Sequence, residues 1–243
     1  LTRINSNSNG EDERVSMGQQ IQRLTQYLDN LPVTVMATER IEADDAIAYI
    51  AKQVLPKSQH FIMSTDTDFL QLIDDRIAVW SPTAKKFYFK EDMKERFGLR
   101  PENYIHYKSL TGDKSDNIPG IKGVGPKTLQ KRLPMLFGED IITMDDLILD
   151  ATNRKSEAKV LASVADNRPL LELNGQLMQL HDVDISGVAK ESIRDIVGRP
   201  KQRWVQFEFL KHLLEDRMKL VNNPEFWLRD SFAHLDVMAT TPE

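Results

Sequence analysis

Seven carboxylates lie in three short groups within the first half of the chain. They are Glu42, Asp44 and Asp45; Asp66 and Asp68; and Asp113 and Asp116. Two carboxylates held about 4 Å apart repel by roughly 1 kcal/mol even at the dielectric of water, so bound cations would stabilise such clusters. Magnesium prefers oxygen ligands, and two such ions about 4 Å apart can activate water for phosphodiester hydrolysis. The carboxylates therefore predict a centre for two divalent metal ions.

Each group also has an ordinary explanation when it is taken singly. Acids at residues 42–45 are typical of a first helical turn, where they cap free N–H groups and favour the helix dipole. Residues 66–68 suit a common turn, and residues 113–116 suit a loop. Their joint occurrence, each at the end of a predicted strand or helix, favours metal binding.

A glycine-rich hairpin follows the third group directly. Its glycines permit backbone conformations that are closed to other residues and allow a ligand to approach closely. Pro126 suits the first turn of a helix, where free amides can bind a phosphate. The residues expected to contact a nucleic-acid backbone are Gly120, Lys122, Gly123, Val124, Gly125, Lys127 and Thr128. The alternative is a connector between helices that binds nothing.

The apolar pattern predicts alternating strands and helices in the first part of the chain. We expect buried strands at residues 33–37, 61–63 and 77–80, and helices at 17–31, 43–54 and 69–73. This order predicts an α/β fold with a parallel sheet and flanking helices. Residues 5–14 are predicted to be a loop. After residue 91 the pattern is mostly helical, ending with helices at 204–220 and 226–235.

The predicted strands also explain where the acidic groups lie. Ligand sites in parallel sheets lie beyond the carboxyl ends of the strands, and residues 42–45 and 66–68 follow two of these ends. Asp66 and Asp68 would share one side of an extended chain. Glu42 and Asp45 would share one side of a helical turn.

Composition sets broad limits on the class of protein. The chain has 243 residues with 40% hydrophobic and 28% charged residues, which suits one large domain or two modest ones. The absence of cysteine excludes disulfides, zinc–thiolate sites and thiol nucleophiles. No signal peptide or long apolar stretch is present, so we expect no membrane contact and a cytoplasmic location, in the host cell if the gene belongs to a phage.

The net charge of −5 does not exclude nucleic acid, because charge averages over faces and bound cations would offset the acidic groups. Basic residues gather near the hairpin at Lys122, Lys127, Lys131 and Arg132. Two smaller basic clusters, Lys85 with Lys86 and Lys201 with Arg203, suit a solvated surface equally well.

Three segments resemble motifs of the flap endonuclease / 5′-nuclease superfamily. Residues 110–128 resemble its helix–three-turn–helix region, and residues 41–46 and 64–69 resemble its two preceding acidic motifs. Residues 80–86 and the last helices are most similar to the ribonuclease H branch found in T-even-type bacteriophages. The resemblance implies a PIN-like 5′-nuclease core, incomplete at its N-terminus, over residues 1–105. A helical DNA-binding domain would follow over residues 106–243.

The resemblance also implies roles for the acidic residues. Glu42, Asp44 and Asp66 match catalytic ligands of the first metal, with Asp45 adjoining. Asp68, Asp113 and Asp116 match ligands of the second metal. The implied cofactors are two Mg²⁺ ions, with Mn²⁺ as a substitute, and a K⁺ ion held by hairpin carbonyls.

The same resemblance implies an activity and partners. The expected protein is a monomeric 5′→3′ exonuclease and flap endonuclease that removes RNA primers during DNA replication. Its substrates would be DNA and RNA–DNA duplexes with 5′ ends or flaps, and replication-fork proteins would be its partners.

The chain departs from the superfamily pattern at its front. Members begin with strands that carry two further aspartates and with a basic helical arch, and no such segment is visible here. The chain therefore looks like a fragment or the product of a split or truncated gene. One alternative is a non-catalytic DNA-binding module that retains the hairpin. Another is the nuclease part of a polymerase-type protein, although residues 239–243 look like a natural end.

Overall fold

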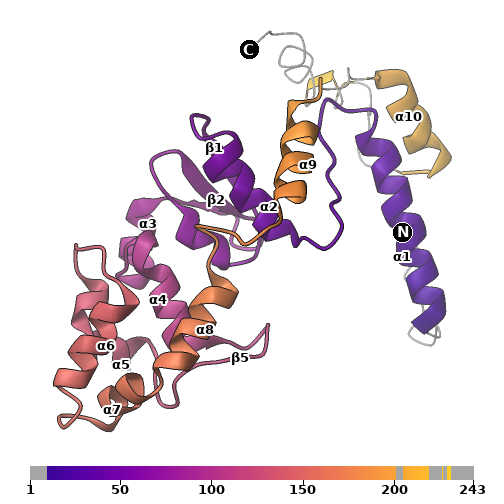
Figure 1. Ribbon diagram of the computed structural model, residues 1–243. Coiled ribbons are helices and arrows are strands. Elements are labelled where there is room, and N and C mark those ends of the chain that lie inside the picture. Colours follow the sequence, from indigo (N-terminus) through magenta and orange to yellow (C-terminus); the bar gives the residue numbers. More distant parts are fainter. Residues whose placement is uncertain (1–9, 201–204, 219–225, 227–228, 231–243) are drawn as a thin grey trace. The chain divides into compact units, whose positions relative to one another are not determined.

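The computed structural model describes residues 10–200, 205–218, 226 and 229–230 (Figure 1). The chain divides into two compact units, each described by itself. One unit contains residues 1–39 and 192–243, and the other contains residues 40–191.

The first unit contains a helix pair, α1 (Gly10–Leu28) and α10 (Gln206–Glu215). Leu31, Phe209 and Leu213 are buried between them. Arg23 on α1 joins the pair through ion pairs of 2.8 Å and 2.7 Å to Glu215 and Asp216. The predicted helices at 17–31 and 204–220 are thus confirmed in their main parts, while residues 226–235 lie mostly outside the described residues.

Two predictions for the N-terminal segment are wrong. The helix begins at Gly10, so residues 10–14 are not a loop. Glu and Arg are good helix formers, but a segment without apolar residues shows no helical periodicity in its sequence. Residues 5–9 lie outside the described part of the chain. Residues 33–38 form no strand, and Val33 and Val35 are exposed. Valine favours strands only where a neighbouring strand and a packed face are available.

The second unit contains a three-stranded sheet in the order β1-β2-β3. β1 (His60–Met63) and β2 (Ile77–Ser81) are parallel, whereas β3 (Lys86–Tyr88) returns antiparallel to β2. The α/β class is confirmed, but the sheet is mixed and not wholly parallel. β3 follows a turn of only a few residues, and such a short connection can join only antiparallel strands.

Helices pack beside this sheet, as the alternating pattern predicted. α2 (Ala43–Tyr49) continues into the π-helical turn η1 (Ile50–Val54), and the 3₁₀-helical η2 (Asp68–Leu72) follows β1. Ile62, Ile77 and Val79 are buried. The expected helices at 43–54 and 69–73 are therefore confirmed to within a residue.

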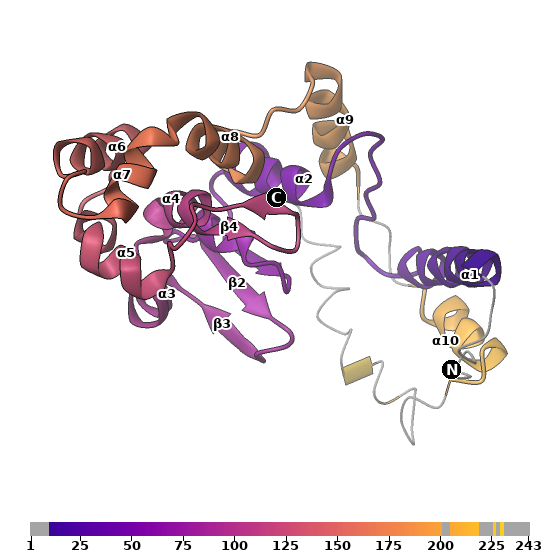
Figure 2. The same cartoon turned by 90° about the horizontal axis from the view of Figure 1, so that it is seen from below.

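The remaining elements are mostly helical. They are α3 (Lys90–Phe97), α4 (Pro101–Thr111), β4 (Gly112–Asp113), β5 (Ile118–Pro119), α5 (Pro126–Arg132), η3 (Pro134–Phe137), α6 (Met144–Asn153), α7 (Lys159–Asp166), α8 (Arg168–Met178) and α9 (Gly187–Gly198). α4 is central, because it packs against η2, η3 and α8. Figure 2 shows β2 and β3 on one side of α4 and α8 on the other. The predicted domain boundary after residue 105 falls inside α4 and stays a prediction.

Candidate metal centre and hairpin

Three of the predicted metal ligands come together in the folded chain. Asp68, Asp113 and Asp116 each offer an oxygen, and these oxygens lie within 4.8 Å of one another. Asp68 begins η2, Asp113 lies in β4, and Asp116 lies in the β4–β5 turn. Three carboxylate oxygens are the hard ligands that divalent cations such as Mg²⁺ and Mn²⁺ prefer, so these residues fit a divalent metal ion.

A buried lysine lies within this group. The Nζ atom of Lys108, on α4, is 2.7 Å from Oδ1 of Asp68 and also forms an ion pair with Asp113. Lys108 is only 6% exposed. Burial favours the neutral amine, but hydrogen bonds to Asp113 and Asp68 outweigh it and raise the pKa of Lys108. The ammonium group therefore supplies part of the positive charge that the acidic group requires.

The two carboxylates that share Lys108 respond differently to it. Hydrogen bonds from Lys108 and Ser115 lower the pKa of Asp113 to about 2. Burial raises the pKa of Asp68 despite the ammonium group, because Asp68 is only 8% exposed and lies near Asp66 and Asp113. The fold therefore favours the ionised form of Asp113, whereas burial of Asp68 disfavours its charged form.

Two buried amides fix the elements that carry this centre. Asn174 on α8 donates to the carbonyls of Ser109 at 2.9 Å and Pro119 at 2.8 Å, joining α4 to β5. Gln71 donates to the carbonyls of Asp68 at 3.0 Å and Met178 at 2.9 Å. Sequence reasoning missed these amides and Lys108. A polar residue among apolar neighbours on a helix was the only available signal.

The first acidic group lies at the start of α2. Glu42 is the N-cap residue, but its side chain makes no capping hydrogen bond. Asp44 accepts a hydrogen bond from the backbone N–H of Asp45 at 2.9 Å. Burial and the negative charges of Asp44 and Glu42 raise the pKa of Asp45. Among the described residues, no ion pair offsets these three acids.

Asp66 has a different place from the one that its spacing suggested. It is exposed, and its Oδ1 accepts the N–H of Asp68 at 2.8 Å, which is the geometry of a local turn. The expectation that Asp66 and Asp68 share one side of an extended chain is therefore wrong. The chain turns after β1, because η2 begins at Asp68.

Glycine occupies each of these hairpin positions for a different local reason. A Cβ at Gly120 would lie 2.2 Å from the backbone of Thr111, so only glycine allows β4 and β5 to approach so closely. Gly123 has a φ of +82°, a left-handed conformation that favours glycine. Gly125 meets no neighbouring atom and is the N-cap of α5, which begins at Pro126 as predicted.

The hairpin exposes three of its seven predicted contact residues. Lys122, Gly123 and Lys127 are exposed, while Val124, Gly125 and Thr128 are half-buried. Gly120 is half-buried against the backbone of Thr111 and Gly112. Lys201 and Arg203 lie outside the described residues.

An acidic group that fits a divalent metal ion, followed by a glycine-rich hairpin on an α/β unit with appended helices, is typical of the class of divalent-metal nucleases. Two family models match the chain in succession. Residues 9–98 match the 5′-3′ exonuclease N-terminal resolvase-like domain, and residues 99–195 match the 5′-3′ exonuclease C-terminal SAM fold. The chain belongs to the 5′-3′ exonuclease family.

Curated relatives agree with this assignment. The thermostable DNA polymerase I of Thermus thermophilus is 33% identical over 159 residues, covering 64% of this chain and 18% of the relative. The 5′-3′ exonuclease of Aquifex aeolicus is 38% identical over 110 residues, covering 45% of this chain and 38% of the relative. The chain thus spans about a fifth of the polymerase and under half of the exonuclease.

Solved structures show the same fold. A bacteriophage T5 protein co-crystallised with metal ions has a TM-score of 0.57 at 21% identity, over 88% of this chain and 74% of that one. A bacteriophage T5 flap endonuclease in a pseudo-enzyme–product complex with DNA and metal ions has a TM-score of 0.51 at 26% identity, over 74% and 61%. None of the described helices is long and apolar enough to span a bilayer.

Proposed function

We propose that this chain is part of a two-magnesium 5′-nuclease that cleaves DNA and RNA–DNA duplexes carrying 5′ ends or flaps. The observation that carries the proposal is the Asp68–Asp113–Asp116 group, whose last member lies four positions before Gly120 of a hairpin with exposed lysines. The carboxylates suit metal binding, and the hairpin suits a phosphate backbone. The known family supports the same chemistry.

We assign catalytic roles to Glu42, Asp44 and Asp66, and metal-ligand roles to the seven carboxylates of the sequence. Mg²⁺ ions, when bound, activate water and stabilise the leaving oxygen. The carboxylates of this chain would orient the metal ions, while Lys122, Lys127 and Thr128 would hold the duplex. The proposal also includes a K⁺ ion held by the hairpin carbonyls. The protein would act as a monomer in the cytoplasm, with partners at a replication fork.

A labelled 5′-flap duplex tests this function directly. The chain is incubated with the duplex in Mg²⁺, in Mn²⁺ and in EDTA, beside Asp113→Asn and the surface control Lys57→Gln. Any cleavage is expected to start from the 5′ side and to require a metal, and it should be abolished in Asp113→Asn and retained in Lys57→Gln. Cleavage that persists in EDTA, or that starts at the 3′ end, would overturn the proposal.

A non-catalytic DNA-binding module is the second candidate. The observation that favours it is Lys108, which partly neutralises Asp68 and Asp113 without a metal. Such a module would bind the flap duplex equally well in Mg²⁺ and EDTA without cleaving it. In any longer form of the protein that does cleave, Asp66→Asn would leave cleavage unchanged if the acids are remnants.

A further inference from the structure

Both sides of the Asp68–Asp113–Asp116 group are hydrogen-bonded to a helix that carries none of the predicted metal ligands. That helix is α8, which packs against α4 (Figure 1). Asp68 belongs to η2, whereas Asp113 and Asp116 belong to β4 and the β4–β5 turn. Buried amide side chains join these two segments to α8. Because amides are uncharged, these contacts act on the geometry of the acidic group and leave its charge unchanged.

Asn174 on α8 fixes the segment that carries Asp113 and Asp116. It is only 1% exposed, and its amide donates to the carbonyls of Ser109 at 2.9 Å and Pro119 at 2.8 Å. Ser109 precedes Asp113 in the chain and Pro119 follows Asp116. One side chain therefore holds both ends of this segment, and it uses both of its N–H donors to do so.

Gln71 fixes the segment that carries Asp68. It is also 1% exposed, and its amide donates to the carbonyls of Asp68 at 3.0 Å and of Met178, the last residue of α8, at 2.9 Å. Its Oε1 atom accepts the N–H of Leu180 at 2.9 Å. A shift of η2 along the end of α8 would break these buried hydrogen bonds and leave polar groups unpaired, which is costly.

The spacing of the three carboxylates depends on both attachments. Their oxygens lie within 4.8 Å of one another although they come from separate segments. Mg²⁺ requires ligand oxygens at about 2.0–2.1 Å in near-octahedral geometry. Such sites require ligands that are held to within about 0.5 Å. Asn174 and Met178 lie about one helical turn apart on α8, so this helix sets the separation of the two segments.

We propose that Asn174 and Gln71 are positioning residues, which hold Asp68 at the distance from Asp113 and Asp116 that a divalent ion requires. The inference rests on the proposed metal binding and adds to it two residues that contact no metal. An apolar side chain of similar size in place of either amide leaves buried carbonyl groups without a donor, so the segments separate. Partners beyond the ligands themselves typically contribute about 10–100-fold to metal affinity.

Isothermal titration of the full chain with Mn²⁺ tests this role in the wild type, Asn174→Leu, Gln71→Met and Asn103→Leu. Asn103 is a matched control, because it is a fully buried asparagine of α4 that holds a different segment. It donates to the carbonyl of Asp140 at 2.9 Å, and its Oδ1 accepts the N–H of Ile142 at 3.1 Å. All three variants should lower the urea midpoint in EDTA by similar amounts. Only Asn174→Leu and Gln71→Met should bind Mn²⁺ about tenfold more weakly.

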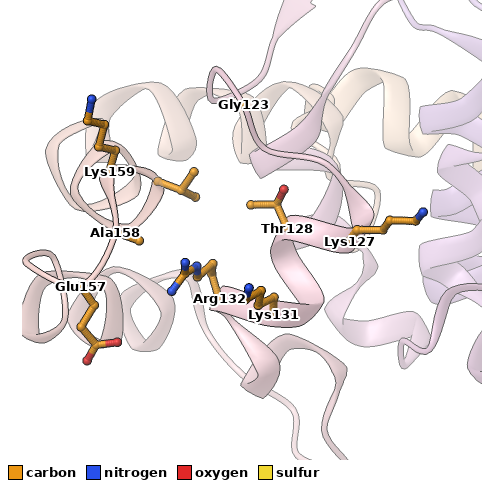
Figure 3. Close-up of a pocket in the computed structure, with 9 residues that line it drawn as sticks. Gly123, Lys127, Thr128, Lys131, Arg132, Glu157, Ala158 and Lys159 are labelled. Atoms are coloured by element: carbon orange, nitrogen blue, oxygen red, sulfur yellow. The ribbon is translucent and has the colours of Figure 1, made fainter.

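Duplex binding provides a second control. A basic cavity of about 550 Å³ lies between the hairpin, α5 and the start of α7, and Figure 3 shows Thr128 and Arg132 on its α5 side. The hydrogen bonds described for Gln71 reach residues 68, 178 and 180, which do not line this cavity. Gln71→Met should therefore bind a short blunt duplex in EDTA as tightly as the wild type, while its affinity for Mn²⁺ falls.

The possible outcomes separate the inference from the proposed function. Unchanged Mn²⁺ affinity in both amide variants overturns the inference. Equal weakening in Asn103→Leu, or a loss of duplex affinity in Gln71→Met, also overturns it, because either would indicate a general loss of structure. If Asn174→Leu does not fold, Asn174→Ser, which keeps one donor, replaces it and should bind Mn²⁺ several-fold more weakly.

The wild type gives the remaining distinction. A wild type that binds Mn²⁺ but leaves flap duplexes uncut would overturn the proposed nuclease activity alone, and the effect of the amides on Mn²⁺ affinity would still support the inference. A wild type that binds no Mn²⁺ would overturn both.

Discussion

The two main acidic groups of this chain are similar in sequence and opposite in structure. At the start of α2, Glu42, Asp44 and Asp45 lie near one another with no cation among the described ion pairs. Around α4, Asp68 and Asp113 share the ammonium group of Lys108. The difference shows that acidic motifs of equal appearance can differ in how far the fold itself neutralises them.

This contrast has a consequence for metal binding. The Lys108 group is held together in the absence of metal, since opposite charges stabilise each other in a partly buried site. The α2 group has only mutual repulsion, which raises the pKa of Asp45. A divalent ion near Asp68 must therefore displace or share with an ammonium group, whereas an ion at α2 meets no such competitor.

Removing the lysine should have the largest effect. Lys108→Met leaves the buried carboxylate of Asp68 and its neighbour Asp113 without a partner, and breaking a buried pair costs about 3–5 kcal/mol. We expect a loss of about 3 kcal/mol in the free energy of unfolding in EDTA, measured by urea denaturation. Millimolar Mg²⁺ should recover part of it, because a metal can replace the ammonium group.

The control for that measurement is Lys94→Met, which breaks an exposed ion pair with Glu139. Such pairs contribute about 0–1 kcal/mol. Equal losses in the two variants would show that Lys108 has no special part in holding the acidic group.

A glycine substitution should disturb one acidic group and spare the other. Gly120→Ala would place a Cβ 2.2 Å from the backbone of Thr111, and the resulting shift of β4 and β5 would move Asp113 and Asp116. We expect a loss of roughly 2 kcal/mol in thermal or urea unfolding. Gly125→Ala, which meets no neighbour, should change stability by less than about 1 kcal/mol.

Measurements of metal affinity should show which of the two acidic groups binds a divalent ion. Isothermal titration with Mn²⁺ is expected to show about tenfold weaker binding, or about 1.4 kcal/mol, in Asp68→Asn. Asp44→Asn tests whether the α2 group binds an ion of its own. If Asp44→Asn lost a second, separate binding step and Asp68→Asn lost none, the assignment of the metal centre to the Lys108 group would be wrong.

The pH dependence of stability should have opposite signs for Asp113 and Asp45, with the smaller magnitude at Asp45. The folded-state pKa of Asp113 is lowered to about 2 from 3.8, so its contribution is present above pH 4 and is lost as the pH falls toward 2. Asp113→Asn should therefore be less stable than the wild type at pH 6 and similar at pH 2. The raised pKa of Asp45 predicts the reverse, with Asp45→Asn slightly more stable at pH 6. Urea unfolding at several pH values measures both, and equal pH profiles would contradict the contrast.

Much of the second unit followed from local patterns. The order of helices and strands from residue 43 to residue 80, and the helix that begins at Pro126, were predictable because apolar spacing and proline act over a few residues. The strand expected at residues 33–37 was wrong, because pairing depends on neighbours that valine content does not reveal. The prediction that Asp66 and Asp68 share one side of an extended chain was also wrong, because the chain forms a turn at these residues.

Residue types and short spacings were enough to identify the acidic motifs, the glycine hairpin and the chemistry that both suit, because oxygen ligands and flexible glycines are properties of single residues. Only the folded chain decided which acids meet. Lys108 joins Asp68 to Asp113 across more than forty residues of sequence, and Asn174 on α8 holds α4 and β5 in place. Such contacts depend on packing between distant elements, and no local pattern encodes them. The same holds for the basic cavity lined by Lys127, Arg132 and Lys159, whose α5 and α7 walls are brought together by tertiary structure.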